Sequence, residues 1–170
     1  MGGCALDLAT KSYAFAHLGM PGGETVWLWD GVFGFQTSLN EGALWGMGQG
    51  LWPVLSVFSL VAAVGIVYWL FFRGGARDWL LTIALAMVTA GIFGNLYDRL
   101  GLHGFRWPAG SLRAGEAVHA VRDFILMMIG PFHWPNYNIA DSLLVCGAVL
   151  LVWHAVFAKP SSDLSSQTCG

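Results

Sequence analysis

The sequence predicts an integral membrane protein that is mainly α-helical and carries a small β-sheet outside the membrane. Of its 170 residues, 56% are hydrophobic and only 11% are charged, whereas about a quarter of a soluble domain is charged. Three apolar runs are each close to the roughly 20 residues that a helix needs to cross the bilayer. Many of the nine Trp residues lie at the ends of these runs, as in an interfacial aromatic belt.

The three apolar runs cover residues 51–72, 79–97 and 139–158. Only helices and closed barrels satisfy the backbone in lipid, and runs of this length predict helices. Pro53 falls in the first turn of the first run, where proline is tolerated. We assign residues 1–158 to one membrane domain and predict that the polar residues 159–170 are a disordered tail.

The segments outside these runs differ in pattern. Residues 24–40 alternate imperfectly around Asp30 and Gly31, which predicts two short strands joined by a turn. Residues 111–130 carry apolar side chains at helical spacing and predict an amphipathic helix at the membrane surface. A net charge of −2 without a basic run gives no indication of a nucleic-acid partner.

Two units of the form Asn-x-x-Asp stand at the joined ends of the second and third runs: Asn95 with Asp98, and Asn138 with Asp141. Antiparallel helices place joined ends on one membrane face, so the two carboxylates can face each other if the helices touch. Residues three apart share a helix face, so each Asn can steady its Asp. Two carboxylates that share a site retain one proton and can act together as general base and general acid. Either unit alone is more often a helix cap or an interfacial acid.

Five ordered motifs, quoted from the sequence, carry a resemblance to a known family. They are "DLATK" at Asp7–Lys11, "NEGALWG" at Asn40–Gly46, "GNLYDRL", "VRDF" at Val121–Phe124, and "WPNYNIADS". In this order they resemble lipoprotein signal peptidase (signal peptidase II), the aspartyl peptidase family A8.

The resemblance implies an aspartic endopeptidase of the bacterial inner membrane that removes the signal peptide from prolipoproteins, cutting before a diacylglyceryl cysteine. Asp98 and Asp141 would be the catalytic pair, facing the periplasm, and the strands of residues 24–40 would form a cradle for the substrate. Its implied partners are the prolipoprotein and membrane lipids, with no metal, cofactor or nucleic acid, and we expect a monomer. The implied binding and supporting residues are Asp7, Lys11, Asn40, Gly42, Asn95, Arg99, Asp123, Asn138 and Ala140.

Three features depart from the family. Five basic residues on the side of the long loop, against three on the other side, would by themselves place that loop in the cytoplasm. The family has four helices, the first ending near the motif that begins at Asp7, so we expect that a first helix is missing. Residues 100–120 are longer than the family pattern and could be a lid or a tolerated insertion.

Two other functions stay open at this stage. A small proton-coupled transporter or channel component could use both acids as a relay, although it would need acids near the midplane and internal repeats. A membrane scaffold without activity is the second alternative.

Overall fold

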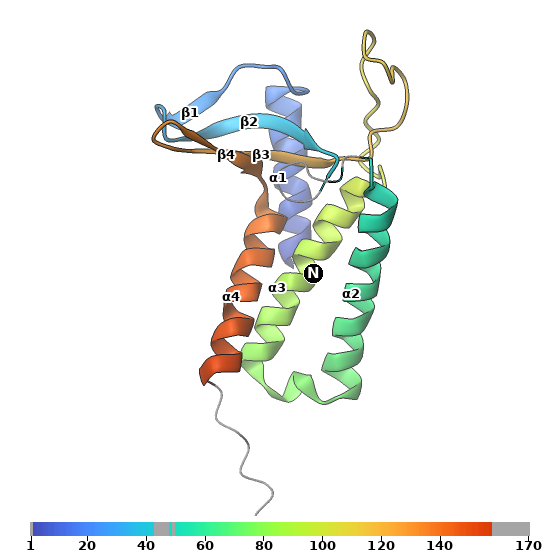
Figure 1. Ribbon diagram of the computed structural model, residues 1–170, viewed down its shortest axis with the longest axis vertical. Helices are drawn as coiled ribbons and strands as arrows, with labels where there is room; N and C mark the ends of the chain where they lie inside the picture. The colour runs from blue at the N-terminus through green and yellow to red at the C-terminus, as the bar shows by residue number, and fades with distance from the viewer. Residues whose placement is uncertain (1, 43–47, 49, 158–170) are drawn as a thin grey trace, which may run out of the picture.

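The computed structural model describes residues 2–42, 48 and 50–157, and the predicted tail of residues 159–170 lies outside this part of the chain. Its helices are α1 (Gly2–Leu18), α2 (Trp52–Phe72), α3 (Trp79–Arg99) and α4 (Ile139–Phe157), with a short 3-10 turn, η2 (Gly75–Arg77). The strands are β1 (Val26–Trp29), β2 (Phe33–Asn40), β3 (Val121–Ile129) and β4 (Phe132–Tyr137). The sheet covers one end of the helix bundle (Figure 1).

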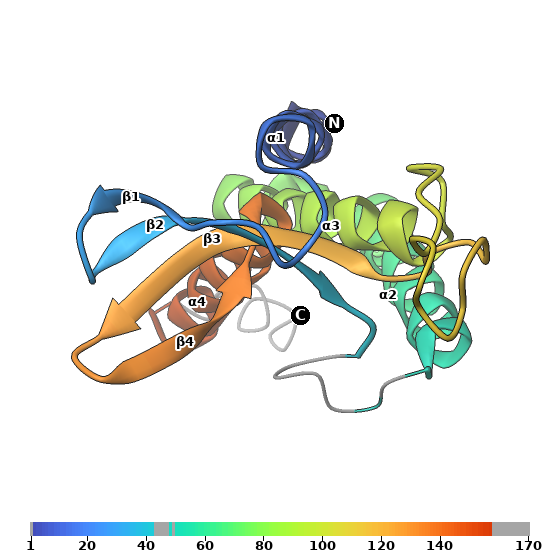
Figure 2. The same ribbon diagram turned by 90° about the horizontal axis from the view of Figure 1, so that it is seen from above.

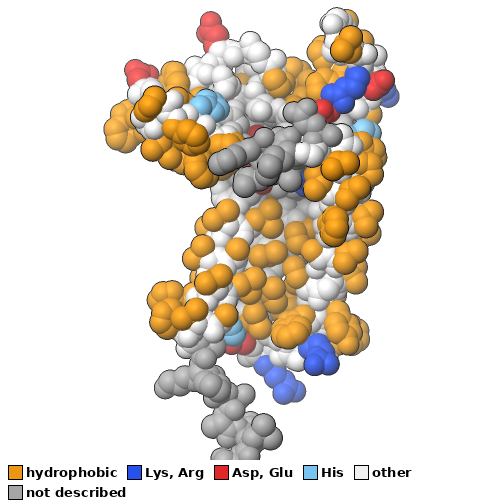
Figure 3. Space-filling model, viewed as in Figure 1, with side chains coloured by type: hydrophobic (Ala, Val, Ile, Leu, Met, Phe, Trp, Pro, Cys, Tyr) orange, Lys and Arg blue, Asp and Glu red, His pale blue; other side chains and the backbone are white. Residues whose placement is uncertain are grey.

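The three predicted membrane helices are confirmed. Helices α2, α3 and α4 are long and apolar enough to cross a membrane, and only 11% of the most apolar stretch of α2 and of α4 is buried inside the protein. Hydrophobic side chains cover the helices, while charged side chains gather at the two ends of the molecule (Figure 3). This distribution fits a bundle whose flanks are solvated by lipid.

Helix α3 lies at the centre of the bundle and approaches α4 closely through small residues. A Cβ atom added to Gly91 would lie 2.5 Å from the Ala140 carbonyl oxygen, and one added to Gly147 would lie 2.8 Å from the Ala84 carbonyl oxygen. Small residues allow this backbone approach between membrane helices. The close contact fixes where the first turn of α4, with Asp141, meets α3.

The sheet is antiparallel with the order β1-β2-β3-β4. Strands β1 and β2 confirm the hairpin that was predicted for residues 24–40. The prediction of an amphipathic helix over residues 111–130 is wrong, because the second half of this range forms β3. Residues Val121–Leu126 are all buried, so this strand lacks the alternation of apolar and polar residues that marks a half-exposed strand. Its apolar residues happen to fall at helical spacing, which is why the sequence favoured a helix.

Helix α1 carries the motif that was expected to end the first helix. The helix continues to Leu18, so Asp7 and Lys11 lie within it and both are buried. Ala14 and Phe15 of α1 pack with Phe124 and Ile125 of β3 in one core cluster. This packing brings the motif in α1 beside the ends of α3 and α4.

Between α3 and β3 the chain forms a short two-stranded projection, residues 105–118, which we call the arm. The Val118 amide donates to the Phe105 carbonyl (3.0 Å), the Trp107 amide to the Glu116 carbonyl (3.0 Å), and the Gly115 amide to the Trp107 carbonyl (2.9 Å). The arm rises beside the sheet above the ends of α2 and α3 (Figures 1 and 2).

Candidate active site

Asp98, at the end of α3, is buried and surrounded by cations. Its Oδ1 accepts from Nε (3.1 Å) and NH2 (2.9 Å) of Arg122, and its Oδ2 accepts from the Arg122 backbone amide (3.0 Å). Lys11 Nζ lies 3.2 Å from the same Oδ2. These contacts occupy both oxygens of the carboxylate, which therefore has little capacity left for a substrate.

Lys11 is fully buried and has three side-chain partners in two helices. Besides Asp98, its ammonium lies 2.8 Å from Asp7 Oδ2 and donates to Asn95 Oδ1 at 3.0 Å. Three partners use all three N–H groups of a lysine. The buried charge is therefore balanced, and Lys11 serves as the link between α1 and α3.

Asp141 lies in the first turn of α4, where two asparagines hold it. Asn95 Nδ2 donates to Asp141 Oδ1 at 2.8 Å, and the backbone amide of Asn138 donates to Asp141 Oδ2 at 3.2 Å. The Asp141 amide donates in return to Asn138 Oδ1 at 3.0 Å, so Asn138 caps α4. Neutral donors orient the carboxylate without adding a positive charge. We expected the Asn95 side chain to orient Asp98, but its Nδ2 donates a hydrogen bond to Asp141 instead.

Asp123, in β3, is the second carboxylate that these asparagines reach. Asn138 Nδ2 donates to Asp123 Oδ1 at 2.6 Å, and the side chain of Asn40 also hydrogen-bonds this carboxylate. Asp123 is almost completely buried. Burial, followed by the negative charge of Asp141, raises its pKa well above the usual value of a carboxyl group.

Asn138 thus connects Asp123 and Asp141 directly, since one carboxylate accepts from its side chain and the other from its backbone amide. The pair predicted from the sequence, Asp98 with Asp141, does not correspond to these contacts. Asp98 is neutralised by Arg122 and Lys11, and the acid that shares the environment of Asp141 is Asp123.

Two grooves open at these two acids. The first, of about 590 Å³, is lined by Asp123 and polar residues of β2 and β4, with Glu41 and Trp107 at its rim. The second, of about 610 Å³, is lined by Asp141 and by apolar residues such as Ile92, Leu144 and Val145. Residues 40, 135 and 136 line both grooves, so the two acids face two adjoining spaces.

The other predicted site residues surround this centre. Arg99 lines the second groove and its NH2 donates to the Gly42 carbonyl at 3.3 Å, while the Gly42 amide donates to Asn40 Oδ1 at 3.0 Å. Asp7 Oδ1 accepts from the Ala140 amide at 2.8 Å and ties α1 to the start of α4. All eleven predicted residues therefore lie in or beside one connected network.

Arg122 is the residue that the sequence analysis missed. It provides a guanidinium and a backbone amide to Asp98, and its NH1 donates to Ser12 at 3.3 Å. The signal was present, because Arg122 precedes Asp123 within the motif "VRDF". Side chains of adjacent strand residues point to opposite faces, so Arg122 points toward Asp98 and Asp123 away from it.

Comparison with known proteins assigns the chain to a family. A family model described as signal peptidase (SPase) II matches residues 1–157. The chain belongs to the signal peptidase II family. This membership makes the chain a peptidase of a bacterial membrane and does not favour the transporter or the scaffold.

Relatives of this peptidase support the assignment. A lipoprotein signal peptidase of Rhodopirellula baltica is 46% identical over 152 residues, which are 88% of this chain and 66% of the relative. A lipoprotein signal peptidase of Desulforapulum autotrophicum is 33% identical over 161 residues, covering 91% of this chain and 87% of that protein. A solved bacterial membrane enzyme shares the fold, with a TM-score of 0.74 at 23% identity over 99% of this chain and 90% of that chain.

Proposed function

We propose that this signal peptidase II is an aspartic endopeptidase that removes signal peptides from prolipoproteins, with Asp123 and Asp141 as its catalytic pair. The observation that carries the assignment is the contact of both carboxylates with Asn138. Two acids so linked in a poorly solvated site share one proton. Burial raises the pKa of Asp123, so we assign the shared proton to this acid, and we assign the role of base to Asp141, which has neutral donors and lines a groove.

The chemistry follows from this distribution of charge. Asp141 accepts a proton from water as the water oxygen attacks the scissile carbonyl carbon, while Asp123 donates its proton to the carbonyl oxygen. The tetrahedral diol then collapses: Asp141 returns a proton to the departing nitrogen as the C–N bond breaks, and Asp123 regains its proton from the diol. The products are a carboxylic acid and an amine, and both acids end in their starting states.

The two grooves suggest how a lipid-modified substrate lies across this pair. The groove at Asp141 is flanked by α3 and α4 and is largely apolar, which suits a signal segment and acyl chains. The groove at Asp123 is polar and lies along the sheet, which suits the hydrophilic segment after the cysteine. Cleavage before a diacylglyceryl cysteine would place the lipid between the bundle and the sheet, at the membrane surface.

The contacts of three basic residues with the site support a periplasmic active site in the inner membrane. Lys11 and Arg122 are buried in ion pairs with Asp98, and Arg99 lines the second groove. Since these three residues contact the site and not lipid headgroups, we leave them out of the count of basic residues that indicates membrane orientation. On the side of the sheet, the count of basic residues then falls from five to two, Arg106 and Arg113. The other side keeps three, so the excess of positive charge lies on the cytoplasmic side, as expected for a membrane protein.

Substitution of each acid tests the proposal. We expect Asp123→Asn and Asp141→Asn to lose at least about 100-fold in cleavage of a diacylglyceryl prolipoprotein, because each removes a proton-transfer group. Both should remain folded, since Asn keeps the shape of the side chain. Cleavage is measured with full-length protein in detergent, and folding by its melting temperature.

Asp98→Asn is the comparison that separates the two candidate pairs. It leaves the buried cations Lys11 and Arg122 with less negative charge, so we expect a lowered melting temperature and activity that follows the folded fraction. Wild-type cleavage by Asp123→Asn, together with a stable and inactive Asp98→Asn protein, would restore Asp98 as the partner of Asp141.

A further inference from the structure

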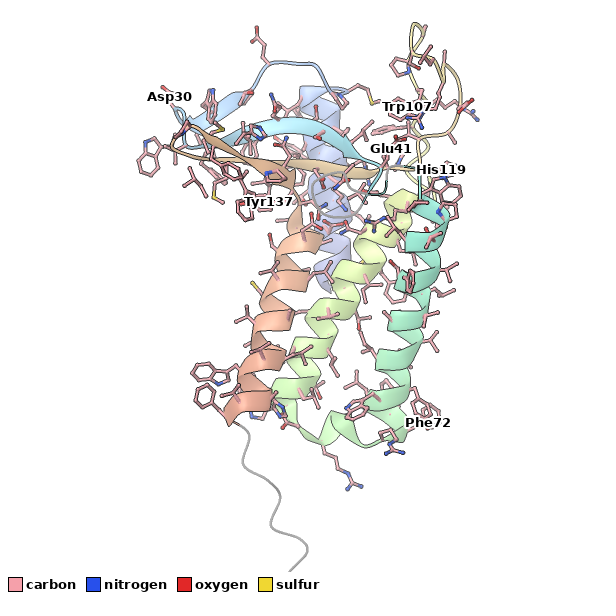
Figure 4. All side chains as sticks on the ribbon, in the orientation of Figure 1. Asp30, Glu41, Phe72, Trp107, His119 and Tyr137 are labelled. Atoms are coloured by element: carbon pink, nitrogen blue, oxygen red, sulfur yellow. The ribbon has the colours of Figure 1, made fainter. Side chains whose placement is uncertain are left out.

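The arm of residues 105–118 reaches the groove at Asp123. Trp107 and Glu41 both line this groove, although they come from the arm and from the end of β2. Figure 4 shows the two side chains close to each other, where the arm meets the sheet. The arm therefore forms part of the wall of the groove that opens at Asp123.

Two further contacts hold this wall together. Arg113 NH1 lies 2.7 Å from Glu41 Oε1, and the Arg113 guanidinium lies over the Trp107 ring at 4.2 Å from its centroid. One cation thus neutralises Glu41 and stacks on the indole. The Glu41 side chain is 19% exposed and that of Arg113 is 45% exposed, so the pair borders water and can respond to a charged ligand.

The base of the arm is fixed to the frame of the site. The His119 ring stacks on Trp52 at the start of α2, with ring centroids 4.1 Å apart, and His119 Nδ1 lies 3.0 Å from the Arg99 carbonyl oxygen. Phe105 packs against Phe15 in the core, with ring centroids 5.7 Å apart. The Trp107 backbone is held by the ladder of the arm at both its amide and its carbonyl. These contacts hold the indole in a defined position beside the groove.

We propose that the arm is a specificity element: Trp107 and Glu41 contact the segment of the substrate that follows the cysteine, and the charge balance of the Glu41–Arg113 pair sets which charges this segment can carry. This inference rests on the proposed function, because the polar groove at Asp123 is the one assigned to that segment. With Arg113 in place, the pair is neutral and the wall tolerates either sign of charge. Without this cation, Glu41 is an uncompensated anion at the groove.

The test uses full-length protein and three synthetic diacylglyceryl prolipoprotein peptides with Lys, Ser or Asp two residues after the cysteine. Arg113→Glu removes the compensating cation and adds a negative charge. We expect it to raise the ratio of kcat/KM for the Lys peptide to that for the Asp peptide by about fivefold, because a reversal of charge at a partly solvated surface has a modest effect on selectivity. The combined variant Glu41→Arg with Arg113→Glu restores a neutral pair and should return the ratio to within about twofold of wild type.

Arg106→Glu is the matched control. It makes the same change of charge on the same arm, but the Arg106 NH1 donates to the Gly115 carbonyl at 2.8 Å and not to a side chain that lines the groove. The ratio of kcat/KM for the Lys peptide to that for the Asp peptide should be the same in Arg106→Glu as in wild type. Trp107→Ala should raise KM for all three peptides, with a smaller effect on kcat, and the melting temperature of each variant reports its folding.

The results separate the two proposals. If wild type does not cleave the Ser peptide, the proposed function fails. If wild type cleaves it and Asp141→Asn does not, but Arg113→Glu lowers kcat/KM equally for all three peptides, the arm has no part in specificity. A change of ratio in Arg106→Glu equal to that in Arg113→Glu would also overturn the inference.

Discussion

At the scale of single residues, the surroundings of an aspartate decide what it can do. Asp98 and Asp123 are both buried, yet Asp98 has Arg122 and Lys11 as partners, whereas Asp123 has the amides of Asn138 and Asn40. Cations favour the ionised form, while burial beside another acid favours the protonated form. The same side chain therefore stabilises the fold at position 98 and is suited to proton transfer at position 123.

The raised pKa of Asp123 predicts a dependence of stability on pH. Burial, with the charge of Asp141, raises this pKa from 3.8 in the folded protein, so the folded state holds the proton to higher pH than the unfolded chain. Stability from this group is complete below the unfolded value and is lost as pH rises through the folded value. Asp123→Asn does not titrate, so its melting temperature should rise relative to wild type as pH increases above about 4.

The measurement is a series of thermal melts of both proteins in detergent across that pH range. The kcat of wild type should also fall on the alkaline side, where Asp123 loses the proton that it donates. A difference in melting temperature that stays constant with pH would show that Asp123 ionises like an ordinary surface acid.

At the scale of elements, the position of Asp141 depends on the close approach of α4 to α3. The first turn of α4 is tied to α1 through Ala140 and Asp7, and to α3 through Asn95. Gly91 lies at this contact and leaves no room for a side chain. Backbone contact between helices, rather than a flexible loop, therefore sets the geometry of the site.

Gly91→Ala tests this dependence. The added Cβ would lie 2.5 Å from the Ala140 carbonyl oxygen and 2.6 Å from Leu144 Cγ, so α4 must shift. We expect a loss of about 1–3 kcal/mol in stability and of about tenfold or more in kcat, because small displacements of catalytic groups are costly. Melting in detergent and cleavage of a prolipoprotein substrate provide the two measurements.

The control for this substitution is Gly65→Ala in α2, where a Cβ would meet nothing within 4 Å. It should keep wild-type activity and gain up to about 1 kcal/mol from helix propensity. Equal effects of the two substitutions would mean that the tight contact of α3 with α4 does not position Asp141.

At the scale of the whole molecule, the bundle and the sheet divide the site between two environments. Apolar helix flanks border the groove at Asp141, and the polar side of the sheet borders the groove at Asp123. Tyr137, the last residue of β4, lies where the sheet meets α4 (Figure 4). The proposed catalytic pair thus lies between an apolar and a polar groove, as expected for an enzyme that cuts a lipid-modified chain at the membrane surface.

The proposed orientation predicts which surfaces a reagent outside the inner membrane can reach. Glu24 is exposed and shortly precedes β1, whereas Arg73 is exposed and directly follows α2, whose end lies at the far side of the bundle from the sheet (Figure 1). With the natural cysteines replaced, Glu24→Cys should react with a membrane-impermeant maleimide in cells with a permeable outer membrane, and Arg73→Cys only after lysis. Labelling of Arg73→Cys alone in intact cells would reverse the orientation.

The three apolar helices, the first hairpin and the group of residues that meet at the site could all be predicted from the amino-acid sequence. Apolar length and short-range alternation are local properties, and the ordered motifs name residues whatever their contacts. The assignment of β3 as a strand required its tertiary contacts, since burial of this strand on both faces removes the expected alternation. The tertiary structure also decided which aspartate accompanies Asp141, because the cations beside Asp98 come from α1 and β3, 87 and 24 residues away in sequence. Contacts at such separations leave no periodic trace, so the same Asn-x-x-Asp pattern marks a structural acid in α3 and a candidate catalytic acid in α4.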